Sequence, residues 1–224
     1  MVRFFGDRLM YFAGRKLVRL YMEVGLSMDI VRQAPMPRGA KVIVANHPTT
    51  SDPFLITALS REHAIILIKE VLFKIPVFGV YLKWCRHIPV KPGEGHKAFE
   101  AAAGLLRRGK TIIVFMEGDI SPAEGGMGKP KTGAVRLALT AKAPVVPVGI
   151  GVRKERVKRV YSVVKGTREL GTWYLSGPYA MTVGKALYIT GEAEDRERVR
   201  RLSAQVLEKV AVLARESEKR IGYT

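Results

Sequence analysis

The sequence is poor in cysteine, in acidic residues and in long apolar runs. Its 224 residues contain one cysteine, Cys85, which excludes an intramolecular disulfide and a cysteine-based metal site and indicates a reducing compartment. No apolar run approaches the length of a membrane-spanning helix, and the first residues show no cleavable signal pattern. No linker, internal repeat or low-complexity tract is evident either, so we expect a single domain with one sizeable core.

The shortage of acidic residues leaves a strongly basic chain. Asp and Glu number 20 against 38 Lys and Arg, a formal net charge of +18, which attracts nucleic acid, an anionic bilayer or a phosphorylated substrate. There is no zinc-finger spacing and no aromatic and glycine signature of an RNA-binding sheet, and the basic residues are spread over several segments. We therefore expect no nucleic-acid partner. A non-enzymatic basic protein that binds acidic lipid or nucleic acid is the alternative.

Residues 3–25 have the pattern of an amphipathic helix. Six apolar residues fall on one face at helical pitch and three arginines on the opposite face: Phe5, Leu9, Ala13, Leu17, Leu20 and Val24 against Arg8, Arg15 and Arg19. A basic, aromatic-rich helix suits the plane of an anionic bilayer, although a core-packed helix with a solvated basic face has the same periodicity. We favour the bilayer, and assign residues 1–35 to a membrane-binding helical segment and 36–224 to an α/β domain.

Short apolar strands alternate with helices through the rest of the chain. We expect strands at 41–45, 63–68, 111–115 and 144–152, and helices from Asp52 to about Leu59, at 97–108, at 133–141 and at 193–219. A basic run from Arg153 to Arg159 leads into further strand-like segments. This alternation predicts an α/β fold with a mixed, largely parallel sheet flanked by helices, in which ligands gather at the C-terminal ends of the strands.

The first of these strands is followed by His47 and, five positions later, by Asp52. A carboxylate on one ring nitrogen fixes the tautomer of an imidazole and stabilises the imidazolium, so the other nitrogen accepts a proton near neutral pH. In that scheme the histidine deprotonates a substrate hydroxyl directly, without a Ser or Cys nucleophile. The spacing alone also fits a helix N-cap, because Asp52 precedes Pro53 and proline is favoured at the first helical position.

The third strand also ends in polar residues, Glu117-Gly118-Asp119, and two such motifs at two strand ends are more informative than one. A hydrolase that combines His47 and Asp52 with Ser51 or Ser121 is a second enzyme hypothesis. It requires a serine on a sharp turn flanked by glycine, and the sequence has no Gly-x-Ser-x-Gly. The remaining histidines have no partner at a recognisable spacing, and we expect them to be structural or exposed: His63, His87 and His96.

Four segments in this order resemble the glycerolipid acyltransferase superfamily, typified by the 1-acylglycerol-3-phosphate acyltransferases of phospholipid synthesis. The family's Asn-His-x-x-x-x-Asp block is similar to Asn46 through Asp52. Its Pro-x-x-Gly segment and the Ile-Pro-Val stretch after it are similar to 76–79 and 88–91. Its Phe-Pro-Glu-Gly-Thr-Arg-Ser block, Lys-x-Gly-Ala step and Val-Pro-Val strand are similar to 115–121, 131–134 and 145–148.

The resemblance implies acyl transfer to a lysophospholipid. It makes His47 the general base on the acceptor hydroxyl and Asp52 the carboxylate that orients it. The donor it implies is an acyl thioester of coenzyme A or acyl carrier protein, with no further cofactor and no metal. Glu117 and Gly118 match the family's acceptor-binding block, and the backbone N–H of Gly118 is the implied oxyanion donor. The resemblance also implies attachment to the cytoplasmic face of the cell membrane.

One position departs from the family pattern. Ile120 stands where family members usually carry an arginine that holds the phosphate of the acceptor, and a neutral residue cannot reproduce the fork of a guanidinium. Lys91 and Lys131 are our candidates for binding the phosphate instead, with Lys129 and Arg86 as further cations nearby in sequence. We expect 1-acyl-sn-glycerol-3-phosphate as the acceptor. The alternative is a lipid acceptor that lacks a free phosphate.

Overall fold

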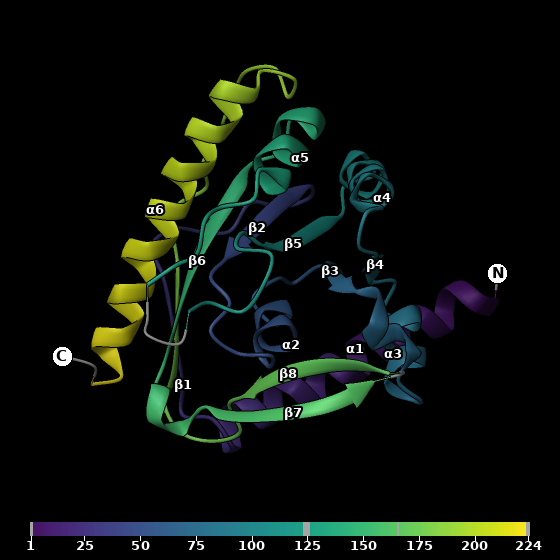
Figure 1. Cartoon of the computed structure of the whole chain (residues 1–224), viewed down its shortest axis with the longest axis vertical. Coiled ribbons are helices and arrows are strands. Elements are labelled where there is room, and N and C mark those ends of the chain that lie inside the picture. Colours follow the sequence, from purple (N-terminus) through teal and green to yellow (C-terminus); the bar gives the residue numbers. More distant parts are fainter. Residues whose placement is uncertain (1, 123–125, 165, 223–224) are drawn as a thin grey trace.

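The computed structural model describes residues 2–122, 126–164 and 166–222. Within them, seven strands form one sheet in the order β1-β9-β6-β2-β5-β3-β4, and two more form a separate ribbon, β7-β8 (Figure 1). The strands are β1 Met28–Arg32, β2 Lys41–Ala45, β3 Ala64–Lys69, β4 Ile88–Val90, β5 Thr111–Phe115, β6 Val145–Val152, β7 Lys158–Val164, β8 Thr167–Trp173 and β9 Tyr179–Val183. Strands β6, β2, β5, β3 and β4 run parallel, and β9 and β1 run opposite to them. The predicted mixed, largely parallel sheet is confirmed.

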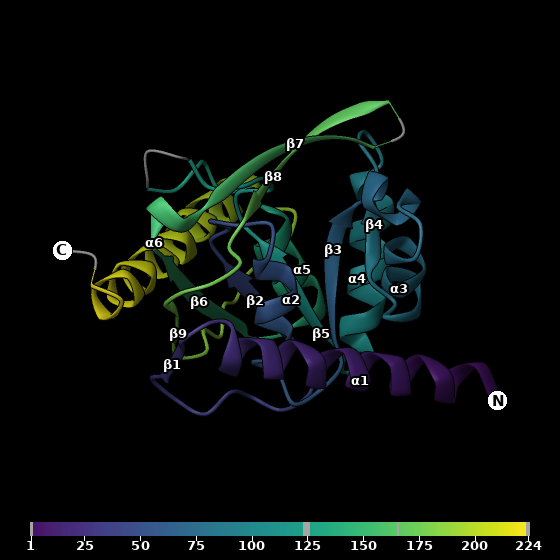
Figure 2. The same cartoon turned by 90° about the horizontal axis from the view of Figure 1, so that it is seen from below.

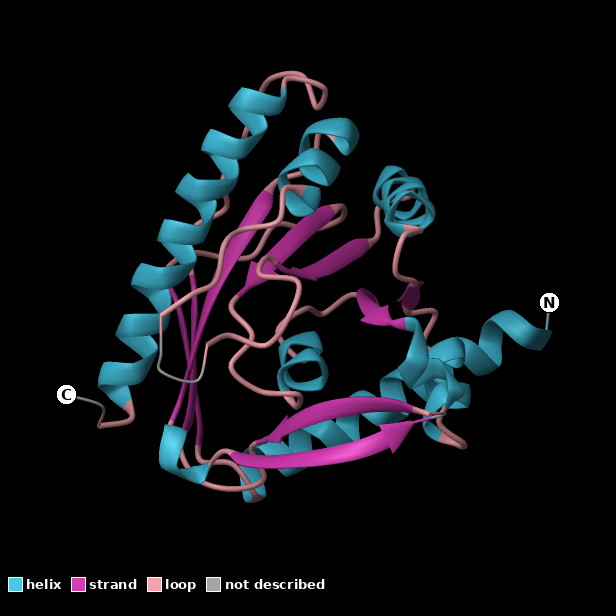
Figure 3. Cartoon of the chain, viewed as in Figure 1, coloured by secondary structure: helices cyan, strands magenta, loops and turns pink. Residues whose placement is uncertain are grey.

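Helices cover both faces of this sheet (Figure 3). They are α1 Val2–Val24, α2 Asp52–Thr57, α3 Phe78–Trp84, α4 Gly95–Arg107, α5 Gly133–Ala141 and α6 Arg196–Arg220, with short 3-10 helices η1 Glu70–Lys74 and η2 Lys154–Arg156. In the part of the chain that the structure describes, no helix combines the length and the apolar character needed to cross a bilayer.

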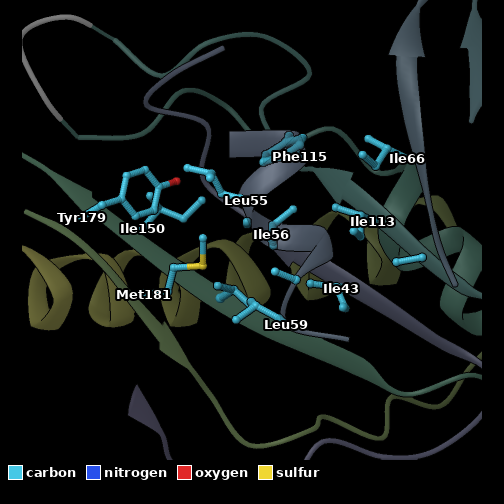
Figure 4. Packing of buried hydrophobic residues seen from close by; sticks show 14 of the residues in the cluster. Ile43, Leu55, Ile56, Leu59, Ile66, Ile113, Phe115, Ile150, Tyr179 and Met181 are labelled. Atoms are coloured by element: carbon cyan, nitrogen blue, oxygen red, sulfur yellow. The ribbon is translucent and has the colours of Figure 1, made fainter. Parts of the chain in front are cut away.

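The central strands are apolar on both faces because each face is covered by helices. Along β2, Ile43 and Ala45 join one hydrophobic cluster, whereas Val42 and Val44 join the other. The first cluster contains residues of α1 and α2, and the second contains residues of α4, α5 and α6. Figure 4 shows the first cluster, in which side chains of α2 meet strands β2, β5, β6 and β9: Leu55, Ile56, Ile43, Ile113, Ile150 and Met181.

The N-terminal helix packs on the body through a face that the sequence pattern did not indicate. Tyr11, Arg15 and Met22 are buried, and the guanidinium of Arg15 donates to the carbonyl oxygen of Arg61 at 3.1 Å. The prediction of Arg15 on a solvated basic face is therefore wrong. The opposite side of α1 is apolar and open to solvent. Leu17 is 69% exposed, Leu20 57% and Val24 81%. Three further residues of the predicted faces lie outside the described side chains: Phe5, Arg8 and Leu9.

The sheet begins before the predicted boundary at residue 35. Strand β1 pairs with β9 from Met28 opposite Tyr179 to Arg32 opposite Val183. The first segment, 1–35, therefore contributes a strand to the sheet as well as a helix packed on its core.

The register of β2 determines where the site lies. Ala45 pairs with Phe115 of β5 on one side and with Val148 of β6 on the other. The side-chain amide of Asn46 then donates to the carbonyl oxygen of Ile150 and accepts from its N–H, both at 2.8 Å. Strands β2 and β5 end at the same edge of the sheet. The residues two positions beyond the Ala45 and Phe115 pair therefore meet there. They are His47 and Glu117, which belong to the two predicted strand-end motifs.

Candidate active site

His47 and Asp52 are in direct contact at this edge. The imidazole Nδ1 of His47 lies 3.0 Å from Oδ2 of Asp52, whose side chain is fully buried while that of His47 is 15% exposed. The imidazole also stacks on the ring of Phe115, with ring centroids 4.1 Å apart and planes 21° apart. Since Nδ1 is held by the carboxylate, Nε2 is the ring nitrogen left to accept a proton from a substrate.

Two residues besides His47 hold the carboxylate of Asp52. Thr49 donates its main-chain N–H to Oδ2 at 2.7 Å and its hydroxyl to Oδ1, and Tyr179 donates its hydroxyl to Oδ1 at 2.7 Å. Burial raises the pKa of Tyr179 well above its ordinary value, and the neighbouring Asp52 carboxylate raises it further. The phenol therefore stays protonated and keeps donating, which fixes the carboxylate with one oxygen toward the imidazole.

The N-cap interpretation of Asp52 is wrong. Asp52 is the first residue of α2, and Ser51 holds the cap position without a side-chain hydrogen bond to the helix. The Asp52 carboxylate turns back toward Thr49 instead of forward to the N–H groups of the first turn. It therefore orients the loop that carries His47, as the catalytic hypothesis requires.

Glu117 bonds the loop that follows β5, residues 116–121 (the Glu117 loop), to the main chain of His47. Its Oε1 accepts from the hydroxyl of Ser121 at 2.5 Å and from the N–H of His47 at 3.4 Å, and its Oε2 accepts from the N–H of Gly128 at 2.6 Å. Ser121 also donates its N–H to the carbonyl oxygen of His47 at 2.8 Å. The two predicted strand-end motifs are thus brought together. Because Glu117 is buried and its carboxylate is bound to protein donors, its contact with an acceptor stays a prediction.

The predicted phosphate-binding residues separate into two places. The side chain of Lys131 lies against Gly118, where an added Cβ would come 3.2 Å from its Cγ, and the Lys131 N–H donates to the carbonyl oxygen of Met116 at 2.7 Å. Lys91 follows β4, which β3 separates from β5, and its ammonium pairs with Glu94 at 2.5 Å. The Glu94 carboxylate raises the pKa of Lys91. The structure therefore brings Lys131, and not Lys91, to the Glu117 loop.

Gly118 has a φ of +74°, which glycine adopts without strain, and its N–H donates to the carbonyl oxygen of Phe115 at 3.1 Å. An oxyanion at this place must share that N–H, so the oxyanion role of Gly118 stays a prediction.

The model of the family described as Acyltransferase matches residues 28–151, which contain the pair, the Glu117 loop and the strands that position them. The chain belongs to the Acyltransferase family.

Two similar proteins are named as acyltransferases. The sequence is 24% identical over 172 residues to a 1-acyl-sn-glycerol-3-phosphate acyltransferase of Pseudomonas aeruginosa, covering 75% of this chain and 62% of that protein. It is 30% identical over 147 residues to a probable 1-acyl-sn-glycerol-3-phosphate acyltransferase of Mycoplasma pneumoniae, covering 60% of this chain and 53% of that protein. The chain thus spans less than two thirds of the length of these relatives.

The fold is also that of a solved structure. The crystal structure of the 1-acyl-sn-glycerophosphate (LPA) acyltransferase PlsC from Thermotoga maritima superposes with a TM-score of 0.63 at 23% sequence identity. The match covers 98% of this chain and 81% of that one, so the two chains share one fold over nearly the whole of this chain.

Several residues of this candidate site were missed by sequence reasoning. Thr49 lies between His47 and Asp52 in the sequence, so its position was a usable signal. Lys69 ends β3, and its ammonium lies 3.5 Å from Oδ1 of Asp119, which places a second cation at the Glu117 loop. Tyr179 gave no signal, because it reaches Asp52 from 127 positions away in the sequence.

The other histidines and serines do not extend the site. His87 is buried and accepts from the N–H of Ile66 at 3.2 Å, His63 contacts the carbonyl oxygen of Cys85 at 2.8 Å, and His96 is exposed. The prediction that they are structural or exposed is confirmed. The hydroxyl of Ser121 binds Glu117, and that of Ser51 contacts the backbone of Tyr174, so neither serine is placed as a nucleophile on the His47 ring. No group of three His, Cys, Asp or Glu suited to a metal occurs among the described residues.

His87 should make the protein less stable in acid. Burial lowers its pKa to about 3, with the charge of His63 as a smaller cause. The unfolded chain binds a proton at this histidine below about pH 6.5, whereas the folded protein does not until about pH 3. The free energy of unfolding should therefore fall by about 1.4 kcal/mol for each pH unit in this window.

His87→Asn tests this expectation, because asparagine keeps an acceptor for the Ile66 N–H but does not titrate. Urea unfolding of both proteins from neutral pH to about pH 4 measures the two slopes. A variant that loses stability as steeply as the wild type would assign the acid sensitivity to other groups.

Proposed function

We propose that this chain is a membrane-associated O-acyltransferase of phospholipid biosynthesis. It moves a fatty acyl group from a thioester of coenzyme A or acyl carrier protein to the hydroxyl of a lysophospholipid, with 1-acyl-sn-glycerol-3-phosphate as the acceptor. The observation that carries the proposal is the contact between Nδ1 of His47 and the buried Asp52 carboxylate. Family membership and the names of the relatives support it.

In the proposed reaction Nε2 of His47 takes the proton of the acceptor hydroxyl as that oxygen attacks the thioester carbonyl. The tetrahedral intermediate then collapses, the carbon–sulfur bond breaks, and the imidazolium returns its proton to the leaving thiolate. Asp52 stabilises the imidazolium between these two steps. The side chain of Lys131 lies against Gly118 and the ammonium of Lys69 lies near Asp119, and both would bind the acceptor phosphate in place of the arginine that Ile120 replaces.

Thiol release tests the activity directly. Free thiol is measured with acyl-coenzyme A or acyl-acyl carrier protein, with and without lysophosphatidate and a lysophospholipid whose phosphate is esterified. The proposal predicts release that depends on an acceptor and an acylated lipid product that appears in equal amount. Release without any acceptor would indicate a thioesterase. No release, together with salt-sensitive binding of nucleic acid, would favour the non-enzymatic alternative.

The proposed membrane attachment is peripheral, at the cytoplasmic face, and uses the exposed side of α1. Leu17, Leu20 and Val24 form an apolar stripe opposite the buried face of this helix, and the basic chain complements anionic headgroups. Replacing all three by serine should reduce sedimentation with phosphatidylglycerol vesicles by about tenfold or more. Wild-type binding should weaken with salt but persist, because apolar insertion is not screened.

The matched control replaces two exposed apolar residues elsewhere, Tyr188 and Val212, by serine. Equal sedimentation of the α1 variant and this control would remove α1 from the membrane contact.

A further inference from the structure

The hairpin β7-β8 has exposed apolar side chains on both of its faces. Cross-strand partners share a face, so Tyr161 and Leu170 lie on one side, together with Val163, and Val160 and Trp173 lie on the other. All are exposed: Val160 by 52%, Tyr161 by 61%, Val163 by 72%, Leu170 by 42% and Trp173 by 38%. A two-stranded ribbon is marginally stable alone in water, and this one leaves much of its apolar surface uncovered.

The same segment is strongly basic. Residues 153–175 contain seven Lys and Arg against two Glu: Arg153, Lys154, Arg156, Lys158, Arg159, Lys165 and Arg168 against Glu155 and Glu169. The guanidinium of Arg168 lies over the ring of Tyr161, 4.2 Å from its centroid. Aromatic rings interleaved with cations are the composition that favours the headgroup region of an anionic bilayer.

The hairpin lies beside the proposed membrane face. In Figure 1 both α1 and the hairpin run along the lower side of the molecule, and the view from below in Figure 2 shows them on either side of α2. Helix α2 begins at Asp52 of the site. A flat surface placed against this side would therefore contact both elements, with the start of α2 between them.

The base of the hairpin is bonded to the loop that carries His47. Thr50 donates its N–H to the carbonyl oxygen of Thr172 at 2.6 Å, and the N–H of Thr172 donates to the hydroxyl of Thr50 at 2.9 Å. Tyr174, which directly follows β8, is fully buried, and its N–H donates to the hydroxyl of Ser51 at 3.4 Å. Thr50 and Ser51 both lie between His47 and Asp52 in the sequence. The hairpin is therefore bonded to the loop of residues 46–51 that carries His47 (the His47 loop).

We propose that the β7-β8 hairpin inserts the side chains of Tyr161, Val163, Leu170 and Trp173 into the interface of an anionic bilayer and thereby sets the His47 loop at the lipid surface. The inference rests on the proposed function, since it names a second membrane contact of the same site. A protein partner would cover one face of the ribbon, whereas a bilayer surrounds both. Among the described residues, no third strand pairs with either outer edge of the ribbon. Backbone groups on such edges, away from Thr172, need water, so insertion stops at the headgroup boundary.

Trp173 reports this insertion directly. The chain has two tryptophans, Trp84 and Trp173, so Trp84→Phe leaves Trp173 as the single emitter. With phosphatidylglycerol vesicles we expect its emission to shift to shorter wavelength and to be quenched by lipids brominated on their acyl chains. Phosphatidylcholine vesicles should produce a smaller shift. An unshifted, unquenched Trp173 in protein that sediments with the vesicles overturns the proposal, as does a response to acyl carrier protein in place of vesicles.

A pair of substitutions tests the energetic contribution. Tyr161→Ser with Leu170→Ser, in a chain with α1 intact, should weaken binding to phosphatidylglycerol vesicles roughly tenfold. The control variant with Tyr188→Ser and Val212→Ser should bind as the wild type does, because it removes exposed apolar side chains outside the hairpin. Circular dichroism and thermal melting verify that both variants are folded. Equal vesicle binding by the two variants contradicts the proposal.

Activity separates this inference from the proposed function. Turnover of a short-chain lysophosphatidate dissolved as monomers should be the same in the hairpin variant and the wild type, while turnover of the long-chain acceptor in vesicles should fall with the binding. Loss of both activities to the same extent would place Tyr161 and Leu170 in the site itself and overturn the membrane role. A wild type inactive on both acceptors would refute the acyltransferase function but leave the Trp173 measurement valid.

Discussion

Replacing His47 by alanine is expected to lower kcat/KM for acyl transfer by about 10²–10⁴-fold, because the variant has no general base for the acceptor hydroxyl. The fold should survive, since the imidazole lies beyond the end of β2 and we expect its stacking on Phe115 to contribute little to the core. Steady-state thiol release from acyl-coenzyme A with lysophosphatidate measures the loss. His96→Ala is the matched control, because His96 is exposed and lies in the first turn of α4. A His47→Ala enzyme with more than about half of wild-type turnover would refute the assignment.

Asp52→Asn should lower kcat/KM for acyl transfer nearly as much as His47→Ala does. The amide cannot accept hydrogen bonds on both of its polar atoms, whereas the carboxylate accepts from Thr49, Tyr179 and His47 at once. The imidazolium also loses the charge that stabilises it. Thermal melting in parallel separates a chemical defect from loosening of this buried cluster, and a fully active, equally stable variant would contradict the orienting role.

The contact between His47 and Asp52 was predictable from the sequence, because few residues separate them. Five positions of chain join His47 to Asp52, so the spacing itself limits how far apart they can be. The meeting of His47 with Glu117 was predictable for another reason, since parallel strands of similar length end at one edge. The register of Ala45 opposite Phe115 then brings them together.

Tertiary contacts were beyond the sequence pattern. Tyr179 holds Asp52 from β9, and no local periodicity relates a strand residue to a loop 127 positions earlier. The packed face of α1 was also missed, because the periodicity identified one apolar stripe and not the second one, which contains Val18 and Met22 and faces the core. Here Arg15 lies on the packed side, with its guanidinium on the Arg61 carbonyl, while Leu17 and Leu20 stay exposed. An amphipathic pattern with two apolar stripes does not by itself distinguish core from membrane.

The second large effect concerns the acceptor phosphate. Lys131→Ala should lower kcat/KM for lysophosphatidate by about 10- to 100-fold, because a hydrogen bond to a charged group contributes about 1.5–3 kcal/mol. The same substitution should change little with a lysophospholipid whose phosphate is esterified and carries less charge. Lys91→Ala is the matched control, because Lys91 pairs with Glu94 beyond β3 and away from the Glu117 loop. Equal losses with both acceptors would show that Lys131 supports the loop and not the phosphate.

Ile120→Arg completes this test, because it restores the guanidinium that the family usually carries. In the wild type we expect it to be nearly silent with lysophosphatidate, since Lys131 lies over Gly118 and Lys69 reaches Asp119 on the same loop. In the Lys131→Ala background the added arginine should recover much of the lost kcat/KM, because it supplies a bidentate donor for the same phosphate. If Ile120→Arg alone raises the ratio of kcat/KM for lysophosphatidate to kcat/KM for the esterified acceptor tenfold or more, the lysines do not bind the phosphate. Ile120 would then mark an enzyme whose natural acceptor has no free phosphate.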